Sequence, residues 1–373
     1  MELSDAVLGA VDEMGFAEPT PVQRRAIPAV LAGRDVMAAA QTGTGKTAAF
    51  VLPLLDRMPR STAESELVML VITPTRELAM QIEDVCAVVG RHTGHTTCVV
   101  VGGVGVEPQK QALKDGCDIL VATPGRLLDL MEQGACNLLH VQALVIDEAD
   151  RLLDMGFLPD VKRIVRGLPH DRQTLLFSAT LSDDVLAHTS SLVKDPMRVD
   201  IAPSGTAAET IDQYVLDVEA QAKKRVLVDV LRHEGSRRVI VFVRGKHRAD
   251  HLSRILCKKG FSSAPIHGDR TQRQRVRALR MFDEGAVDVL VATDVLSRGI
   301  DIEGVAYVVN VDVPHEPENY IHRIGRTGRA GQAGWALTLC SPEERRDLQR
   351  IERLMGKVIP PYPRIAELSS VVA

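Results

Sequence analysis

The sequence is poor in several features that mark particular protein classes. Aromatic residues make up 3% of the 373 residues, so stacking of bases on exposed rings is not the main way in which this chain would hold a nucleic acid. The only tryptophan, Trp335, lies in an apolar stretch and is predicted to be a packed strand residue. The six cysteines contain no Cys-x-x-Cys pair, which favours reduced thiols in a cytoplasmic protein over disulfides or zinc. No apolar run approaches a membrane span, and the acidic start does not resemble a signal peptide.

The chain also lacks a net positive charge. The formal net charge is −4, which argues against a protein that holds a polyanion by bulk positive charge. Residues 1–203 carry 18 Lys or Arg and 27 Asp or Glu, whereas residues 204–373 carry 27 and 22. An anionic ligand would therefore be attracted more by the second half, although random variation of solvated surface charge would explain the difference as well.

Short apolar runs alternate with helical stretches along the whole chain. The runs at 66–73, 118–123 and 143–147 are almost entirely apolar, which is typical of parallel strands covered by helices on both faces. We therefore predict an α/β protein of two domains, 1–202 and 211–373, each with a mostly parallel sheet. The small, polar segment 203–210 is predicted to be the linker.

The two halves share a short internal repeat. Asp118-Ile-Leu-Val-Ala-Thr123 is echoed by Asp288-Val-Leu-Val-Ala-Thr293, which indicates duplication of one domain type, although chance can produce so short an echo. In open α/β sheets, ligands bind at the carboxyl ends of the strands. The motifs described below mostly follow such ends.

The segment 40–47 is predicted to hold the phosphates of a nucleotide. It lies between a strand and a helix, and its glycines allow backbone N–H groups to turn toward oxyanions. Lys46 would reach the β and γ phosphates, and the Thr47 hydroxyl would bind Mg²⁺. The first position is Ala40 where the strict pattern has glycine, so a simple Gly/Thr-rich turn is the alternative. The binding residues are Ala40, Gln41, Thr42, Gly43, Thr44, Gly45, Lys46 and Thr47.

An apolar strand at 143–146 ends in acidic residues. Asp147 suits a Mg²⁺ ligand, and Glu148 is placed to orient and deprotonate a water. Acids at this position also cap helices, so they are not decisive alone. A second cluster, His322-Arg323-Ile324-Gly325-Arg326-Thr327-Gly328-Arg329, supplies cations that would stabilise charge on a γ-phosphate. It belongs to the opposite half of the chain from Lys46, so we predict a split site.

Together these motifs resemble the DEAD-box RNA helicases of superfamily 2. The tetrapeptide Asp147-Glu148-Ala149-Asp150 gives that family its name, and the similarity runs from Gly15 to about Ala330. The resemblance implies two RecA-like domains, ATP and Mg²⁺ as ligands, and RNA as partner. It also implies an adenine-reading segment within about 1–24, in which Phe16 would stack on the base and Gln23 would bond its edge.

The resemblance implies further roles, residue by residue. Asp301 would lie near the ribose, Arg326 and Arg329 would be arginine fingers, and His322 would occupy a coupling position. Residues that would link the ATP site to domain closure are Asp150, Ser178, Thr180 and Arg298. Those that would contact RNA are Pro74, Arg76, Gly103, Thr123, Arg126, Gly268, Arg275 and Thr293. One departure is Gly245, which stands where the family commonly has threonine, so that RNA contact is in doubt.

The expected function is an ATP-dependent RNA helicase that binds RNA independently of sequence and unwinds short duplexes. Phosphate and sugar contacts carry little base information, and the preference for RNA follows from the resemblance. We expect a monomer without membrane association. Three alternatives stay open: an ATP-gated RNA clamp, a DNA-directed motor of the same superfamily, and a nucleotide-binding protein without a nucleic-acid partner.

Overall fold

The computed structural model describes residues 3–40, 43–58, 66–181, 183–201, 211–294, 302, 304–328 and 334–364. The chain divides into two compact units, Met1–Ser204 and Gly205–Ala373, and each is described by itself. The division falls within the predicted linker 203–210, which lies outside the described residues.

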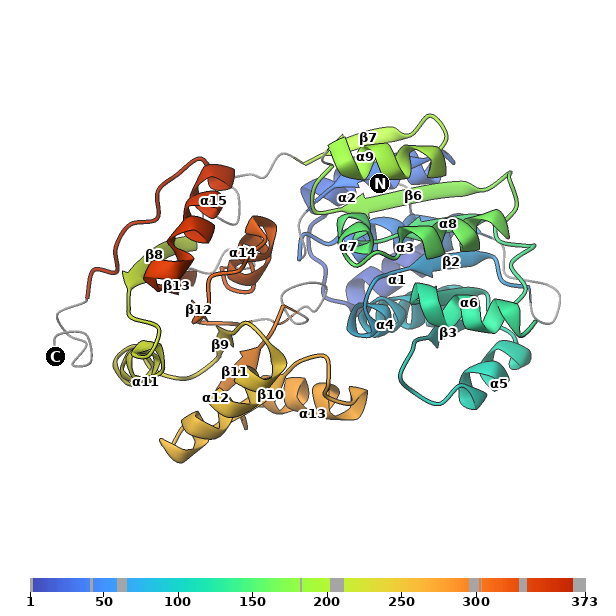
Figure 1. Ribbon diagram of the computed structural model, residues 1–373. Helices are drawn as coiled ribbons and strands as arrows, with labels where there is room; N and C mark the ends of the chain where they lie inside the picture. The colour runs from blue at the N-terminus through green and yellow to red at the C-terminus, as the bar shows by residue number, and fades with distance from the viewer. Residues whose placement is uncertain are drawn as a thin grey trace. The chain divides into compact units, whose positions relative to one another are not determined.

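Unit 1 contains a seven-stranded sheet in the order β3-β4-β2-β5-β6-β1-β7, and Figure 1 shows helices on both of its sides. Every strand pairing recorded within it is parallel. The strands are β1 (Val36–Ala39), β2 (Met69–Ile72), β3 (Thr97–Val100), β4 (Ile119–Ala122), β5 (Ala143–Ile146), β6 (Gln173–Ser178) and β7 (Met197–Asp200). The helices are α1 (Asp5–Glu13), α2 (Pro21–Leu31), α3 (Lys46–Arg57), α4 (Arg76–Thr93), α5 (Glu107–Asp115), α6 (Pro124–Glu132), α7 (Ala149–Asp154), α8 (Leu158–Arg166) and α9 (Asp183–Thr189), followed by the 3₁₀ turn η1 (Ser190–Leu192).

The sheet of unit 1 has a hydrophobic core on each face. Successive side chains of β2 point to opposite faces, so Met69 and Val71 join a core with α1 to α4, whereas Leu70 and Ile72 join a core with α6 to α8. Each of these four side chains is fully buried. Burial on both faces explains why the strand segments of the sequence are apolar at successive positions.

Unit 2 contains a six-stranded parallel sheet in the order β10-β11-β9-β12-β13-β8. Its strands are β8 (Ile211–Asp217), β9 (Val239–Phe242), β10 (Ser263–Ile266), β11 (Val289–Ala292), β12 (Tyr307–Asn310) and β13 (Gly334–Cys340). Its helices are α11 (Lys223–His233), α12 (Lys246–Lys258), α13 (Gln272–Asp283), α14 (Pro317–Ile324) and α15 (Arg345–Met355), with the 3₁₀ turn η2 (Pro342–Glu344) before α15.

Unit 2 also buries a core on each face of its sheet, because Ile240 and Phe242 of β9 join one cluster and Val239 and Val241 the other. The prediction for Trp335 is confirmed: it lies in β13 and stacks on a tyrosine of β12 with 4.4 Å between ring centroids. In both units, all strands of the sheet run in one direction, so their carboxyl ends share one edge.

None of the helices in the described ranges is long and apolar enough to cross a membrane.

Candidate nucleotide and RNA sites

The predicted phosphate loop connects β1 to α3. Gly43 and Gly45 have φ of 82° and 84°, left-handed values that glycine adopts at little cost. A Cβ on Gly45 would lie 2.5 Å from Nε2 of Gln23, so the close approach also requires glycine. Ala40 is 3% exposed and donates its N–H to the carbonyl oxygen of Ser178. Ala40, which replaces the glycine of the strict pattern, therefore continues the pairing of β1 with β6. Two predicted loop residues, Gln41 and Thr42, lie outside the described residues.

Lys46 begins α3 and is buried with 6% exposure. Its Nζ lies 3.8 Å from Oδ1 of Asp147 and has no hydrogen-bond acceptor in the described ranges. A buried ammonium without an acceptor is unfavourable, because it has lost its hydration without a replacement. Phosphate oxygens would supply the missing acceptors, so the setting of this cation fits the anion that the sequence predicts here.

Asp147 follows β5 and is 1% exposed. Burial raises the pKa of its carboxyl to about 6, although nearby Lys46 acts in the opposite direction. Its Oδ1 accepts the backbone N–H of Glu148 at 2.9 Å. A cation beside this buried carboxyl would stabilise its ionised form.

The oxygen donors here fit magnesium. Asp147 offers a carboxylate, and Thr47, half-buried in the first turn of α3, offers a hydroxyl. Hard cations such as Mg²⁺ prefer oxygen ligands and are usually held by one or two protein groups together with phosphates. Across the described residues, no group of three or more His, Cys, Asp or Glu side chains could bind a metal.

Glu148 stands in a strained backbone conformation. Its φ is 52° and its ψ is 55°, and it forms the N-cap of α7. Such left-handed geometry costs a non-glycine residue about 1 kcal/mol or more. The side chain is 5% exposed, and its Oε2 lies 3.8 Å from Nη1 of Arg151. Strain at a buried carboxylate beside a phosphate loop is typical of a catalytic position.

Asp150 connects β5 with β6. Its backbone N–H donates to Oγ of Ser178 at 3.2 Å, and its Oδ2 accepts the N–H of Ala179 at 3.2 Å. The predicted coupling residues Asp150 and Ser178 are therefore in direct contact, and Thr180 follows them on the surface.

The predicted adenine-reading residues precede the loop. Phe16 is 42% exposed, and its stacking on adenine stays a prediction. Gln23 uses both ends of its amide within the protein: Oε1 accepts the N–H of Thr20 at 2.9 Å, and Nε2 donates to the carbonyl oxygen of Gly45 at 3.1 Å. Gln23 thus ties α2 to the phosphate loop, a role that sequence reasoning missed. Its contact with adenine stays a prediction.

The predicted RNA residues of unit 1 gather at the carboxyl ends of β2, β3 and β4. Arg76 lies against Gly103 so closely that a Cβ there would be 2.0 Å from Nη1. Arg126 donates from Nη2 to the carbonyl oxygen of Val104 at 3.2 Å. Pro74 precedes α4, and Thr123 donates its backbone N–H to the end of β3. Because β3, β4 and β2 are neighbours in the sheet, these residues share one stretch of its edge.

In unit 2, the predicted RNA residues follow β10 and β11. Thr293 donates its N–H to the carbonyl oxygen of Ile266 at 3.2 Å, and Gly268 is exposed two residues beyond β10. Arg275, in the first turn of α13, is only 7% exposed. Gly245 has φ of 97°, so threonine at this position would be strained. Two further predicted residues, Arg298 and Asp301, lie outside the described residues.

The cationic cluster of α14 separates into members with different surroundings. Arg323 is fully buried: Nε and Nη2 bind the carboxylate of Asp294 at 2.5 and 2.9 Å, and Nη1 donates to the carbonyl oxygen of Asp312 at 2.8 Å. Its charge is therefore neutralised inside unit 2. Arg323 belongs to the cluster predicted from the sequence to bind phosphate, and its pairing with Asp294 argues against that role. The helical period could have revealed this, because Arg323 shares the inward face of α14 with Tyr320 and Ile324.

His322 lies in the last turn of α14, and Arg326 lies two residues beyond its end. Arg326 is 2% exposed and donates from Nε to the carbonyl oxygen of His322 at 3.3 Å. His322 is half-buried. Arg329 lies outside the described residues.

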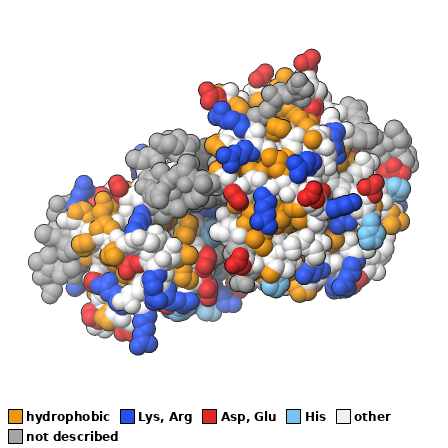
Figure 2. All heavy atoms as spheres, turned by 90° about the horizontal axis from the view of Figure 1, so that it is seen from above, with side chains coloured by type: hydrophobic (Ala, Val, Ile, Leu, Met, Phe, Trp, Pro, Cys, Tyr) orange, Lys and Arg blue, Asp and Glu red, His pale blue; other side chains and the backbone are white. Residues whose placement is uncertain are grey.

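Charge on the surface is mixed. Figure 2 shows Lys and Arg side chains interspersed with Asp and Glu on the face that it draws.

The raised pKa of Asp147 predicts that replacing it with asparagine stabilises ligand-free unit 1. Below about pH 4 the carboxyl is protonated in the folded and unfolded states alike. Between that pH and 6 the unfolded state ionises first, so the stability of the wild-type protein falls, and the loss persists at higher pH. At pH 7.5, Asp147→Asn should raise the free energy of unfolding by about 1–3 kcal/mol.

Urea unfolding at pH 5 and pH 7.5 checks this. Circular dichroism follows both units, and fluorescence of Trp335 reports unit 2 as an internal control. The gain should shrink at pH 5. A variant less stable than the wild type at both pH values would contradict the burial penalty.

Comparisons with known proteins agree with this geometry. A model of the DEAD/DEAH box helicase family matches residues 20–188, and a model of the helicase conserved C-terminal domain matches residues 222–331. The DEAD-box ATP-dependent RNA helicase CshA of Streptococcus pneumoniae is 46% identical, over 96% of this chain and 68% of its own length. RhpA of Helicobacter pylori, named in the same way, is 44% identical over 94% of this chain and 71% of its own.

Solved structures give the same result for the fold. S. cerevisiae Dbp5 bound to RNA and ADP BeF3 matches with a TM-score of 0.87 and 32% identity, over 96% of this chain and 93% of that chain. Mss116 bound to ssRNA and UDP-BeF matches with a TM-score of 0.88 and 30% identity, over 99% and 80%. The predicted α/β fold of two RecA-like domains is thereby confirmed. The chain belongs to the family of DEAD-box ATP-dependent RNA helicases.

Proposed function

We propose that this protein hydrolyses ATP to ADP and phosphate and couples the reaction to RNA binding and local duplex unwinding. The observation that carries the proposal is the buried Lys46 ammonium, which lacks an acceptor and lies 3.8 Å from Asp147 in a loop shaped for phosphates. The names of the relatives, which are ATP-dependent RNA helicases, support the same activity.

Within unit 1, each group would have a separate task. Lys46 and the N–H groups of the loop would hold the phosphates. Magnesium, bound by Asp147 and Thr47, would neutralise charge on the phosphate oxygens. Glu148, held by its strained backbone, would orient a water for attack and accept its proton.

The RNA would be held by its backbone. Arg76 and Arg126 offer guanidinium groups, and Gly103 and Gly268 allow close approach of the main chain. Because these groups recognise phosphate and sugar, binding would be independent of sequence. A preference for RNA over DNA would come from contacts to the 2′-hydroxyl.

Communication between the two ligands would pass through Asp150. Asp150 follows β5, the neighbour of β2 with its predicted RNA residues. Its side chain accepts the N–H of Ala179 just beyond the end of β6, the strand next to β1. ATP that repositions Glu148 and Asp150 would thereby change the adjacent RNA edge. Arg326 and Arg329 would act on the terminal phosphate, as the family resemblance implies.

We further propose that the protein is cytoplasmic and acts as a monomer. The six cysteines are free thiols, which is consistent with a reducing compartment.

The first test compares RNA with DNA as activators. ATP hydrolysis should rise strongly with single-stranded RNA and little with DNA of the same sequence. Release of a strand from a short RNA duplex should require ATP. Equal stimulation by DNA would favour a DNA-directed motor, and RNA-stimulated hydrolysis without strand release would favour an RNA clamp.

Glu148→Gln should bind ATP and RNA as the wild type does and lose about 10²–10⁴-fold in turnover, because glutamine cannot accept a proton. Phosphate release measures turnover, and equilibrium titration measures ATP binding. Glu132→Gln, which changes an exposed carboxylate paired with Arg163, is the control and should behave as the wild type. Full hydrolysis by Glu148→Gln would remove Glu148 from the mechanism.

Arg326→Ala should retain ATP binding and lose about 10³-fold in hydrolysis, as loss of an arginine finger does in other phosphoryl-transfer enzymes. Because the side chain is buried, Arg326→Lys is measured as well. Lysine keeps the positive charge but lacks the planar guanidinium with its several N–H donors, so this variant should recover little activity. Arg280→Ala, which alters an exposed arginine on α13, is the control. Unchanged turnover in a folded Arg326→Ala variant would refute the role.

A further inference from the structure

Helix α12 carries an unusual row of basic side chains. His247, His251, Arg254 and Lys258 are all exposed. They are spaced by four, three and four residues, so they are neighbours on one face, about 5–6 Å apart at Cβ. We call these four residues the α12 row.

The chain segment that carries the α12 row is strongly basic, although its second helix, α13, packs in the core on the other face of the sheet. The segment 244–280 contains only two acidic residues, Asp250 and Asp269, against eleven Lys or Arg, namely Arg244, Lys246, Arg248, Arg254, Lys258, Lys259, Arg270, Arg273, Arg275, Arg277 and Arg280. This segment therefore accounts for the positive balance of the second half of the chain.

Both acidic residues of this segment are already paired. Oδ1 of Asp250 contacts Nε2 of His267 at 3.1 Å and accepts a hydrogen bond from Arg270. Asp269 lies 2.7 Å from Nζ of Lys246. Their negative charge is thus compensated by residues outside the row.

Arg254 and Lys258 make no ion pair with a carboxylate in the described part of the chain, whereas some exposed cations of unit 2 do. On α15, for example, Arg345 pairs with Asp217 and Arg350 with Asp347. In the described part of the chain, Arg254 bonds only the carbonyl oxygen of Asp250 in its own helix, and Lys258 has no carboxylate partner. These two cations are available to an external anion.

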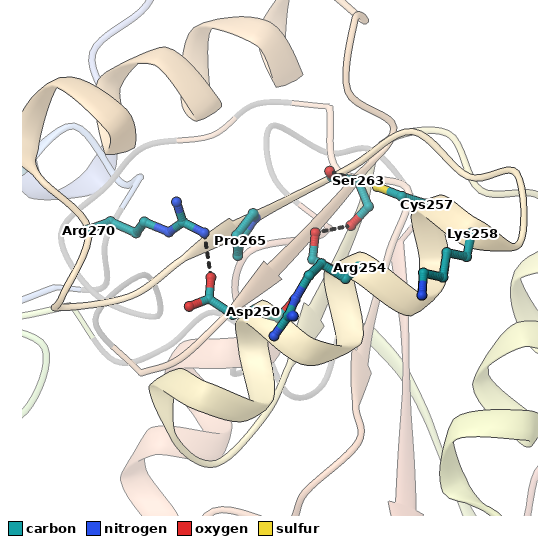
Figure 3. Close-up of a pocket in the computed structure, with 8 residues that line it drawn as sticks. Asp250, Arg254, Cys257, Lys258, Ser263, Pro265 and Arg270 are labelled. Atoms are coloured by element: carbon teal, nitrogen blue, oxygen red, sulfur yellow. Dashed lines mark hydrogen bonds and ion pairs between the residues drawn. The ribbon is translucent and has the colours of Figure 1, made fainter.

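A hollow of about 480 Å³ lies beside the row, between α12 and β10. Figure 3 shows Arg254 and Lys258 on the same side of α12, with Cys257 directed toward Ser263. β10 is the edge strand of its sheet, but it is a poor template for an added strand. Pro265 has no N–H to donate, and the carbonyl oxygen of Ser263 accepts the Cys257 thiol at 3.5 Å.

The α12 row begins at the proposed RNA edge. Gly245 immediately precedes α12 and follows β9, whose carboxyl end lies at the same edge as those of β10 and β11. The thirteen residues of α12 cover about 20 Å. The row therefore leads from the strand ends that carry Gly268 and Thr293 toward the opposite end of the sheet.

We propose that the α12 row binds the phosphate backbone of RNA that extends beyond the strand-edge site. The inference rests on the proposed RNA binding. RNA is favoured over an acidic protein because the large hydrophobic residues exposed in the described part of the chain include none from α12. Protein interfaces depend on apolar or aromatic anchors. The row instead offers cations and imidazole donors at regular spacing, which suits a repeating anion.

The proposal predicts a dependence on RNA length. An RNA of roughly 8 nucleotides would fill the strand-edge site alone, whereas one of roughly 30 would also reach the row. The double variant Arg254→Gln/Lys258→Gln should bind the long RNA about three- to tenfold more weakly and bind the short RNA as the wild type does. The slope of log affinity against log salt should decrease by about 1.4 for the long RNA.

The matched control is Arg345→Gln/Arg350→Gln, which removes two charges from α15 in the same unit. It should leave both affinities unchanged. The rate of ATP hydrolysis at saturating short RNA should equal that of the wild type in both double variants, because neither changes a residue of the ATP or strand-edge sites.

A second measurement uses the wild-type protein. Cys257 is an exposed thiol in the hollow, Cys136 is half-buried, and the remaining four are buried. Long RNA should slow alkylation of Cys257 by iodoacetamide, whereas short RNA should not, with Cys136 as the internal reference.

The outcomes are separable. A wild-type protein that binds neither RNA would refute the proposed function itself. Normal binding of the long RNA by Arg254→Gln/Lys258→Gln, with no protection of Cys257, would overturn the role of the row alone and leave an acidic protein as its ligand.

Discussion

The buried ammonium of Lys46 is the constraint on which the candidate site depends. It lies at the start of α3 and 3.8 Å from Asp147, and the protein supplies no hydrogen-bond acceptor for it within the described residues. The same burial raises the pKa of Asp147 to about 6. The ligand-free site therefore holds two charges in an unfavourable setting that a nucleotide with a cation would correct. The ligand-free protein is therefore less stable at this site, and part of that loss would be recovered when a nucleotide binds.

The order of strands in the sheet of unit 1 explains how its carboxyl edge can carry both the predicted nucleotide residues and the predicted RNA residues. β1, β6 and β5 are adjacent and carry the phosphate loop, the Ser178 contact and the acidic residues. β2, β4 and β3 continue the same sheet and carry the predicted RNA residues. Asp150 lies at the boundary between the two sets and is bonded to Ser178 of β6 and to Ala179, which follows it. In the proposed function, a change at one ligand would reach the other through these contacts.

Sequence reasoning succeeded where local chemistry decides the structure. The left-handed Gly43 and Gly45 and the fully apolar strands follow from backbone and burial rules. It missed contacts between residues that are distant in the sequence. These are the hydrogen bond from the Gln23 side chain to the carbonyl oxygen of Gly45 and the ion pair of Arg323 with Asp294. It also could not show that Arg275 is mostly buried. These partners are distant in sequence and meet only through packing, which periodicity does not encode.

The most direct test of the account is thermodynamic coupling between the two ligands. The affinity of the wild-type protein for a non-hydrolysable ATP analogue is measured with and without single-stranded RNA, and the affinity for RNA with and without the analogue. The account predicts that each ligand tightens the other by the same factor, about 5- to 150-fold. Affinities that do not depend on the second ligand would contradict it.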